Sequence, residues 1–322
     1  MSSVIFLGTP NFGSVVLQGL IDQGYDVKAV VTQPDKRVGR KQVVHQSAVK
    51  QTALKHNLPV YQPAKLSGSD ELAELMKIEP DFIVTAAYGQ FLPTKFLKSA
   101  KIAPVNVHGS LLPKYRGGAP IQYSVLNGDK ETGITIMEMV KKMDAGDIFS
   151  QKALPIEADD TSGTLFDKLS ILGRDLLLET LPKFIDGTIT RTPQNEAKVV
   201  FSPNISKEQE QIKLSMTAEQ ANNLIRALNP DPGAYLMLDG KRFKIWKAKL
   251  LAEKTSFPAG TLVTNKKRFV ISMANGSELE LLEVQPTGKK KMNKVDIAYI
   301  KEHGKSIVSP VIFTSGEKII DE

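Results

Sequence analysis

The first half of the chain alternates short apolar runs with amphipathic stretches, and this alternation restricts the possible folds more than any other feature. The apolar runs lie at residues 4–8, 27–32, 82–87, 104–109 and 133–139. After the first run, Phe12, Val16 and Leu20 recur at the spacing of one helical face. Strands that alternate with helices pair in parallel, with helices on both faces of the sheet. The pattern therefore predicts an α/β fold with a doubly wound, mostly parallel, Rossmann-like sheet.

The pattern changes after a predicted helix that ends near residue 184. Residues 186–209 show little apolar periodicity and carry proline, asparagine, serine and glycine, which is typical of a linker. Beyond a further helix over residues 217–227, short apolar runs with turn residues predict a small β-barrel. We therefore expect a first domain over residues 1–189, a linker over residues 190–208 and a smaller barrel domain over residues 209–322.

Composition narrows the class of protein further. With 322 residues, 41% of them hydrophobic, and no apolar run long enough to span a membrane, the chain is expected to be a soluble, cytoplasmic globular protein. The absence of cysteine excludes disulfides, thiolate nucleophiles and cysteine-based zinc sites. The net charge is +7, and residues 209–322 hold 18 Lys and Arg against 13 Asp and Glu. Such an excess of basic residues is typical of proteins that bind a polyanionic partner.

A glycine-rich turn at residues 8–13, GTPNFG, follows a strand and opens a helix, as a dinucleotide fingerprint does. Pro10 stands where the second glycine would let the backbone approach a pyrophosphate. No acidic residue follows the next strand at the position that binds a ribose. The sequence therefore argues against bound NAD and favours a tight strand-to-helix turn, which could still bind another anion.

Two polar residues end the apolar run at residues 104–109. Asn106 and His108 are two apart, so on a strand their side chains project to the same face. In open α/β sheets, ligands bind at the carboxyl ends of the strands. An amide beside an imidazole suits polarising a carbonyl and moving a proton rather than holding a metal. The alternative is that Asn106 caps the next turn and His108 is hydrogen-bonded locally.

A loop with two carboxylates, Asp144 and Asp147 around Gly146, follows the run at residues 133–139. A loop carboxylate near an imidazole would favour the imidazolium and fix its orientation. Taken alone, the same residues form an ordinary turn.

These residues carry a family resemblance. Asn106, His108, residues 110–113, Arg116-Gly117 and Pro120 form the pattern N-x-H-x-S-L-L-P-x-x-R-G-x-x-P, which resembles the 10-formyltetrahydrofolate-dependent formyltransferases. Residues 86–93, AAYGQFLP, and residues 143–148, MDAGDI, look like that family's other two site segments. Residues 6–12, 32–41 and 158–169 are similar to the branch of the family that formylates initiator methionyl-tRNA.

The resemblance implies a catalytic group and a folate site. The catalytic group would be Asn106, His108 and Asp144, which would stabilise the oxyanion formed when the amine attacks the formyl carbon. Which group moves which proton stays open. The resemblance implies 10-formyltetrahydrofolate as the formyl donor. We expect no NAD, because of Pro10, and no metal, because Asp144, Asp147 and one His are too few ligands for a catalytic zinc site. Its pterin pocket would be formed by Gln90, Phe91, Leu92, Ser110, Leu111, Leu112, Pro113 and Val140.

Two basic clusters are the expected contacts to tRNA. Lys36, Arg37, Arg40 and Lys41 stand in one loop, which by charge alone would be a solvated surface loop. The resemblance implies that this loop enters the acceptor arm, with Arg40 as its main basic residue. It also implies an OB-like second domain that binds tRNA through phosphates, where Lys289, Lys290 and Lys291 supply base.

Other functions stay open at this point. A relative acting on an amino-sugar nucleotide or another small amine would not need the basic loop or a basic barrel. A catalytically inactive RNA-binding protein of this fold would not need Asn106, His108 and Asp144. We expect the protein to act as a monomer.

Overall fold

The computed structural model describes residues 1–38, 42–238, 240–264, 269–293 and 311–312. Contacts within the chain divide it into two units. The first unit comprises residues 1–121, 131–155 and 164–203, and the second comprises residues 122–130, 156–163 and 204–322.

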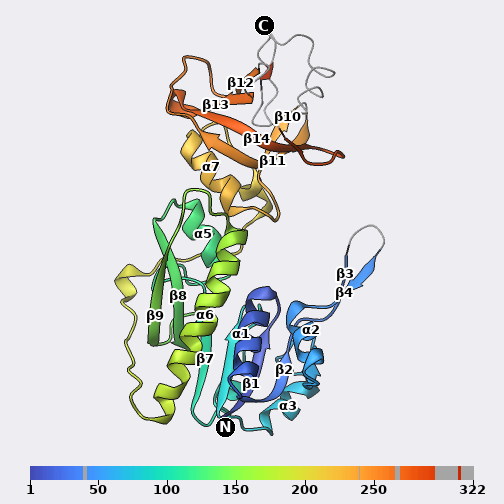
Figure 1. Cartoon of the computed structure of the whole chain (residues 1–322), viewed down its shortest axis with the longest axis vertical. Helices are drawn as coiled ribbons and strands as arrows, with labels where there is room; N and C mark the ends of the chain where they lie inside the picture. Colours follow the sequence, from blue (N-terminus) through green and yellow to red (C-terminus); the bar gives the residue numbers. More distant parts are fainter. Residues whose placement is uncertain (39–41, 239, 265–268, 294–310, 313–322) are drawn as a thin grey trace. The chain divides into compact units, whose positions relative to one another are not determined.

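The first unit is built on a seven-stranded sheet with the order β5-β2-β1-β6-β7-β8-β9. The first five strands in that order pair in parallel, whereas β8 pairs antiparallel with β7 and with β9. This confirms the predicted mostly parallel sheet (Figure 1). The strands are β1 (Ser3–Gly8), β2 (Asp26–Val31), β5 (Val60–Tyr61), β6 (Phe82–Ala86), β7 (Ala103–His108), β8 (Glu131–Glu138) and β9 (Ile148–Pro155).

Helices follow the strands as the sequence predicts. They are α1 (Asn11–Asp22), α2 (Ala48–Lys55), α3 (Asp70–Met76), α4 (Thr94–Leu97), α5 (Pro120–Leu126) and α6 (Ser162–Ile185). Ser47 begins α2 by accepting a hydrogen bond from the Lys50 amide, and Ser69 begins α3 in the same way at Leu72. Acidic residues in the first turn of α3 interact favourably with its helix dipole.

Helices cover both faces of the sheet. On one face, Ile5 and Leu7 of β1 join one hydrophobic cluster with Leu72 of α3 and Phe96 of α4. On the other face, α6 lies so close that a side chain at Gly173 would meet Val107 of β7. Because side chains alternate along a strand, Asn106 and His108 lie on the opposite face of β7 from Val107.

A two-stranded hairpin of β3 (Lys36–Val38) and β4 (Val43–His45) follows β2. Figure 1 shows it extending away from the helices and strands of its unit. Val43 and Val44 are exposed on β4.

The second unit is an antiparallel sheet packed on α7 (Ala218–Ala227). Its strand order is β10-β11-β14-β13-β12-β16, and β15 pairs with β14. Thr217 and Gln220 form a capping box that begins α7, and Leu224 and Ile225 pack against the sheet. The strands are β10 (Tyr235–Leu238), β11 (Lys241–Leu250), β12 (Thr261–Thr264), β13 (Phe269–Ser272), β14 (Glu278–Pro286), β15 (Met292–Asn293) and β16 (Val311–Ile312).

The predicted linker has defined contacts over much of its length. Thr192 exchanges two backbone hydrogen bonds with Ile148 of β9, and Phe201 pairs with Arg116 as an isolated bridge. Residues 190–203 therefore lie along the first unit. The predicted domain boundaries at residues 189 and 209 stay a prediction.

Among the described residues, none of the helices combines the length and apolar character that crossing a membrane requires.

Candidate active site

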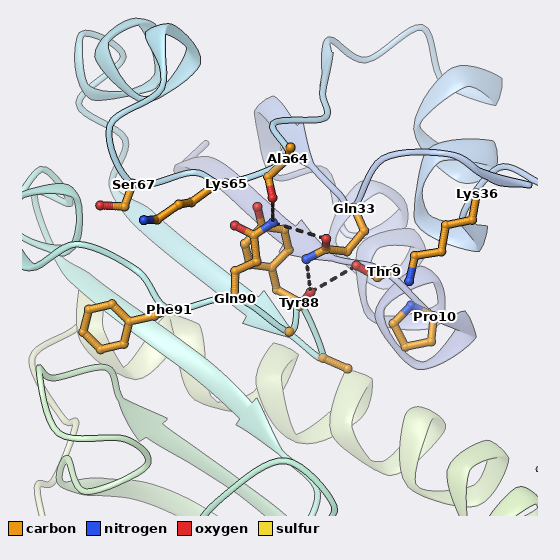
Figure 2. Close-up of a pocket in the computed structure, with 12 residues that line it drawn as sticks. Thr9, Pro10, Gln33, Lys36, Ala64, Lys65, Ser67, Tyr88, Gln90 and Phe91 are labelled. Atoms are coloured by element: carbon orange, nitrogen blue, oxygen red, sulfur yellow. Dashed lines mark hydrogen bonds between the residues drawn. The ribbon is translucent and has the colours of Figure 1, made fainter. Parts of the chain in front are cut away.

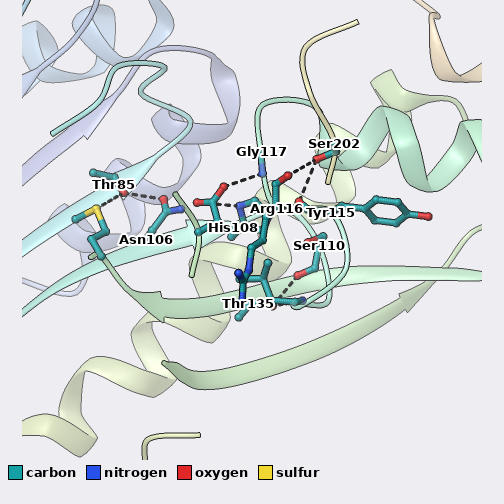
Figure 3. A network of polar contacts seen from close by, with 12 residues as sticks. Thr85, Asn106, His108, Ser110, Tyr115, Arg116, Gly117, Thr135 and Ser202 are labelled. Atoms are coloured by element: carbon teal, nitrogen blue, oxygen red, sulfur yellow. Dashed lines mark hydrogen bonds and ion pairs between the residues drawn. The ribbon is translucent and has the colours of Figure 1, made fainter. Parts of the chain in front are cut away.

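The carboxyl ends of β6 and β7 bring Thr85 beside Asn106. These two residues are partners in the parallel register, and the Thr85 hydroxyl donates a 2.7 Å hydrogen bond to Asn106 Oδ1 (Figure 3). The amide oxygen of Asn106 is thereby engaged, and its Nδ2 group is oriented to donate elsewhere. The face predicted from the spacing of Asn106 and His108 therefore carries an oriented amide donor.

His108 is buried, and the surroundings of its imidazole fix the tautomer. Its Nε2 lies 2.9 Å from the carbonyl oxygen of Tyr115, to which Ser202 Oγ also donates. A carbonyl can only accept, so Nε2 carries a hydrogen in both protonation states of the ring. Nδ1 is therefore the ring nitrogen that gains and loses a proton.

Asp144 faces that second nitrogen from the loop between β8 and β9. Its Oδ1 lies 3.8 Å from His108 Nδ1, and its Oδ2 accepts a 2.9 Å hydrogen bond from the Gly117 amide. Asp144 has a φ of 48°, in the left-handed region that side chains rarely adopt. The carboxylate is oriented to stabilise a charge on Nδ1.

The loop after β7 folds back on itself beside Asn106 and His108. Ser110 Oγ donates to the Lys114 carbonyl, and the Leu112 amide donates to Thr135 Oγ1 of β8. The peptide bond between Leu112 and Pro113 is cis. Ser110 and Leu112 are buried. The Ser110 side chain and the Leu112 backbone amide stabilise the loop. The folate contact predicted for residues 110–113 stays a prediction.

Arg116 is a buried cation to which the sequence assigned no role of its own. Its side chain is 1% exposed, its Nε donates to Gln194 Oε1 at 3.0 Å, and its Nη2 donates to Glu196 at 2.7 Å. Nη1 has no hydrogen-bond partner among the described residues. The hydrogen bond from Arg116, and then that from Lys142, lowers the pKa of Glu196 to about 2. Both partners of this guanidinium come from the predicted linker.

A pocket of about 960 Å³ opens at the carboxyl ends of β1, β2 and β6 (Figure 2). Lys36, Lys65 and Phe91 line the pocket, and 58% of the Phe91 surface is exposed. The remaining lining residues are Thr9, Pro10, Gln33, Ala64, Ser67, Ala87, Tyr88, Gly89 and Gln90. An aromatic ring and two ammonium groups suit a ligand with a flat ring and negative charge.

The side chain of Gln90 is hydrogen-bonded within the wall of this pocket. Its Oε1 accepts from the Leu66 amide at 2.9 Å, and its Nε2 donates to the Ala64 carbonyl and to Gln33 (Figure 2). Leu92 is buried in the neighbouring cluster, whereas Phe91 and Val140 are exposed. Among the predicted folate residues after β6 and β8, Phe91 and Val140 thus present accessible apolar surface.

The turn at residues 8–13 owes its glycines to close packing. A side chain at Gly8 or Gly13 would come within 2.8 Å or 2.7 Å of the Ala86 carbonyl oxygen. This supports the interpretation of a tight turn between β1 and α1. In the described part of the chain, no group of three or more His, Asp or Glu side chains could hold a metal ion.

The predicted tRNA contacts lie on the β3–β4 hairpin and after β14, and two of them fall outside the described residues. Lys36 and Arg37 are exposed on β3, while Arg40 and Lys41 lie outside the described residues. Lys289 and Lys290 are exposed beyond β14. Lys291 lies 3.9 Å from the ring centroid of Trp246 and 3.4 Å from Glu283 Oε1. Trp246 is itself 7% exposed, as expected for a core residue.

Comparison with known proteins identifies relatives along the whole chain. The methionyl-tRNA formyltransferase of Lactobacillus gasseri is 92% identical over 322 residues, which is all of both chains, and that of Lactobacillus acidophilus is 64% identical over the same length. The fold is shared with an N-formyltransferase from Helicobacter canadensis, solved with folinic acid and dTDP-3-aminofucose, at 21% identity and a TM-score of 0.68. That match covers 89% of this chain and 100% of the other.

A second structural relative is HypX from Aquifex aeolicus in complex with tetrahydrofolic acid, at 17% identity and a TM-score of 0.65. That match covers 95% of this chain and 48% of the other. Residues 1–181 match the family described as formyl transferase, and residues 204–301 match the formyl transferase C-terminal domain. The chain belongs to the formyl transferase family.

Proposed function

We propose that this chain transfers the formyl group of 10-formyltetrahydrofolate to the free amino group of initiator methionyl-tRNA. The observation that carries the proposal is the 92% identity, over the full length of both chains, to the methionyl-tRNA formyltransferase of Lactobacillus gasseri. The arrangement of Asn106, His108 and Asp144 at one sheet edge supplies the groups that such a transfer needs.

The reaction is an acyl transfer between two nitrogens. The amino nitrogen of methionine attacks the formyl carbon, a carbon–nitrogen bond forms, and the carbonyl electrons move onto oxygen. Collapse of this oxyanion re-forms the carbonyl and breaks the bond to N10 of the folate. The attacking amine loses a proton and N10 gains one, so a catalyst must stabilise the oxyanion and carry a proton.

We assign oxyanion stabilisation to Asn106 and to protonated His108. Thr85 holds the oxygen of the Asn106 amide, which leaves Nδ2 as a donor toward the developing negative charge. The Nδ1–H of the imidazolium is the second donor, because Nε2–H is held by the Tyr115 carbonyl. A proton that passes between the reacting groups and His108 would do so through Nδ1.

Asp144 then stabilises the positive charge on His108. Its carboxylate stands 3.8 Å from Nδ1 and is held on its other side by the Gly117 amide, so its position does not depend on the imidazole alone. The two side chains are largely shielded from water, so the carboxylate can stabilise a positive charge that the ring carries during transfer.

The folate donor and the tRNA would reach this site from different surfaces. Exposed apolar side chains at Phe91, Val140 and Met143 are suited to contact a pterin ring. Lys36 lies both on the β3–β4 hairpin and in the lining of the pocket, which supports entry of a polyanion along the hairpin.

Incubation with 10-formyltetrahydrofolate carrying a labelled formyl group tests the proposal. Label should enter methionyl-tRNA with a kcat/KM at least about 10²-fold above that for a dTDP-linked amino sugar, because only the tRNA can use the basic hairpin. N-acetylmethionyl-tRNA, whose amine is blocked, is the matched control and should remain unlabelled. Label in the amino sugar and none in methionyl-tRNA would contradict the proposal and favour the small-amine alternative.

A further inference from the structure

We propose that Gln194, within the segment predicted as a linker, is a positioning residue that holds Asp144 in the geometry needed for formyl transfer. The role of Asp144 in this inference rests on the proposed function, whereas the contacts of Gln194 do not.

The primary amide of Gln194 is engaged at all of its polar atoms. Nε2 donates to the carbonyl oxygens of Asp144 and Gly146, each at 2.8 Å. Oε1 accepts from Arg116 Nε at 3.0 Å. Because a guanidinium can only donate, it fixes the oxygen of the amide on the Arg116 side and directs both N–H groups at the loop.

The two hydrogen bonds from Gln194 hold a loop whose backbone conformation at Asp144 is unfavourable. Asp144 has a left-handed φ of 48°, a conformation that is unfavourable for a residue with a side chain. The two hydrogen bonds from Gln194 Nε2 stabilise this conformation from outside the loop. At Gly146 the chain passes against the Glu138 backbone, where a side chain would collide. The conformation at Asp144 therefore depends on a partner outside the loop.

Arg116 connects that partner to the loop after β7. Its backbone donates to the Val200 carbonyl and accepts from the Ser202 amide, so residues 200–202 are hydrogen-bonded to this loop. The next residue, Gly117, donates its amide to the Asp144 carboxylate. Asp144 is therefore held at its carboxylate by Gly117 and at its backbone by Gln194, and Arg116 links the two. Figure 3 shows Arg116, Gly117 and Ser202 in this network beside His108.

Loss of the Gln194 amide should act on catalysis more than on folding. Gln194 is partly exposed and its amide contacts polar atoms, so its replacement should leave the hydrophobic core intact. The Asp144 carboxylate would shift relative to Nδ1 of His108, and a misplacement of about 1 Å at a catalytic centre can cost up to about 10²-fold in rate. Substrate affinity would change little, because the hydrogen-bond partners of Gln194 are Asp144, Gly146 and Arg116, to none of which substrate binding is assigned.

The test uses Gln194→Met, which keeps the size of the side chain without its hydrogen bonds, in the full-length protein. We expect kcat for methionyl-tRNA to fall by about 10-fold to 10²-fold, with KM for both substrates within about 3-fold. Asn195→Ala is the matched control from the same segment. The Asn195 side chain accepts from the Ala197 amide, and its loss should leave kcat within about 2-fold.

A double-mutant cycle separates positioning from a general structural defect. In an Asp144→Asn background, Gln194→Met should lower kcat by less than about 2-fold, because its effect passes through the carboxylate. The same fold-loss in both backgrounds, or an unchanged kcat in Gln194→Met, would overturn the proposal. Gln194→Glu serves as the second variant if Gln194→Met does not fold. It keeps the acceptor for Arg116 but faces the two loop carbonyls with an oxygen.

A crystal structure of the Gln194 variant gives a readout that needs no acceptor substrate. The distance between Asp144 Oδ1 and His108 Nδ1 should grow from 3.8 Å by about 1 Å or more. An unmoved Asp144 would overturn the proposal. If the wild-type protein fails to formylate methionyl-tRNA while Asp144 moves in the variant, the proposed function fails and the positioning role of Gln194 stands.

Discussion

Replacement of His108 by asparagine or by glutamine separates the roles of its two ring nitrogens. The amide nitrogen of asparagine is bonded to Cγ, as Nδ1 is, whereas that of glutamine lies one bond further out, as Nε2 does. Nε2 is held by the Tyr115 carbonyl at 2.9 Å, and Nδ1 faces Asp144. His108→Asn therefore keeps a neutral donor on the catalytic side, and His108→Gln keeps the contact to Tyr115.

The expected magnitudes follow from these contacts. An oxyanion donor is worth about 10² to 10³ in kcat and a proton-transfer group about 10² to 10⁴. His108→Gln loses both and should fall by about 10³-fold or more. His108→Asn loses the charge and the proton transfer but retains a donor, so it should stay about 10-fold more active than His108→Gln. The Tyr115 carbonyl keeps its hydrogen bond from Ser202, so either variant should lose no more than about 1 kcal/mol of unfolding free energy.

Single-turnover formyl transfer under saturating donor measures this difference, with urea unfolding as the control for stability. Greater activity of His108→Gln than of His108→Asn would refute the assignment, because it would make Nε2 the nitrogen that acts on the substrate. Equal loss in both variants with unchanged stability would show that neither neutral donor contributes.

Three further predictions test other parts of the structure. Because Arg116 lowers the pKa of Glu196 to about 2, the ion pair stabilises the fold above the ordinary pKa near 4.5 and ceases to do so as the pH falls toward 2. The difference in unfolding free energy between wild type and Glu196→Gln, measured in urea, should therefore shrink between pH 4.5 and pH 2, and a pH-independent difference would argue against the pair. Gly146→Ala should lower kcat by about 10-fold or more because its side chain would meet the Glu138 backbone, and a wild-type kcat would show that the Asp144 loop tolerates displacement. Triple replacement of residues 289–291 by glutamine should flatten the slope of log K for tRNA against log salt by up to about 0.9 for each phosphate that the lysines neutralise in the wild-type complex, and an unchanged slope would exclude this cluster from the tRNA interface.

The sequence predicted the sheet and one face of the site because both follow from local spacing. Apolar runs that alternate with helices specify a parallel sheet, and the two-residue spacing of Asn106 and His108 places them on one face of β7. The sequence offered Asp144 and Asp147 as loop carboxylates, and the family resemblance selected Asp144, whose loop carries no periodic pattern of its own. In the structure its carboxylate lies beside His108.

The parts that the sequence missed depend on contacts between distant residues. Gln194 and Glu196 reach Arg116 across about 80 residues, and their segment, which lacks periodicity, was interpreted as a linker. Gln90 lines the pocket, but its side chain is hydrogen-bonded to the Ala64 carbonyl, and its predicted contact with folate stays a prediction. A glutamine that hydrogen-bonds to backbone carbonyls has no sequence pattern that distinguishes it from a solvated one, so these contacts required the structure.

We propose that Asn106 and His108 act on the formyl carbonyl and not on binding of the donor. Rapid-quench measurement of single-turnover transfer to methionyl-tRNA by Asn106→Ala, with the Kd for a stable folate analogue measured on the same preparation, tests it most directly. We predict a fall of about 10² to 10³-fold in the transfer rate constant with a Kd within about 3-fold of wild type. A wild-type rate constant, or a loss explained entirely by weaker donor binding, would contradict the claim.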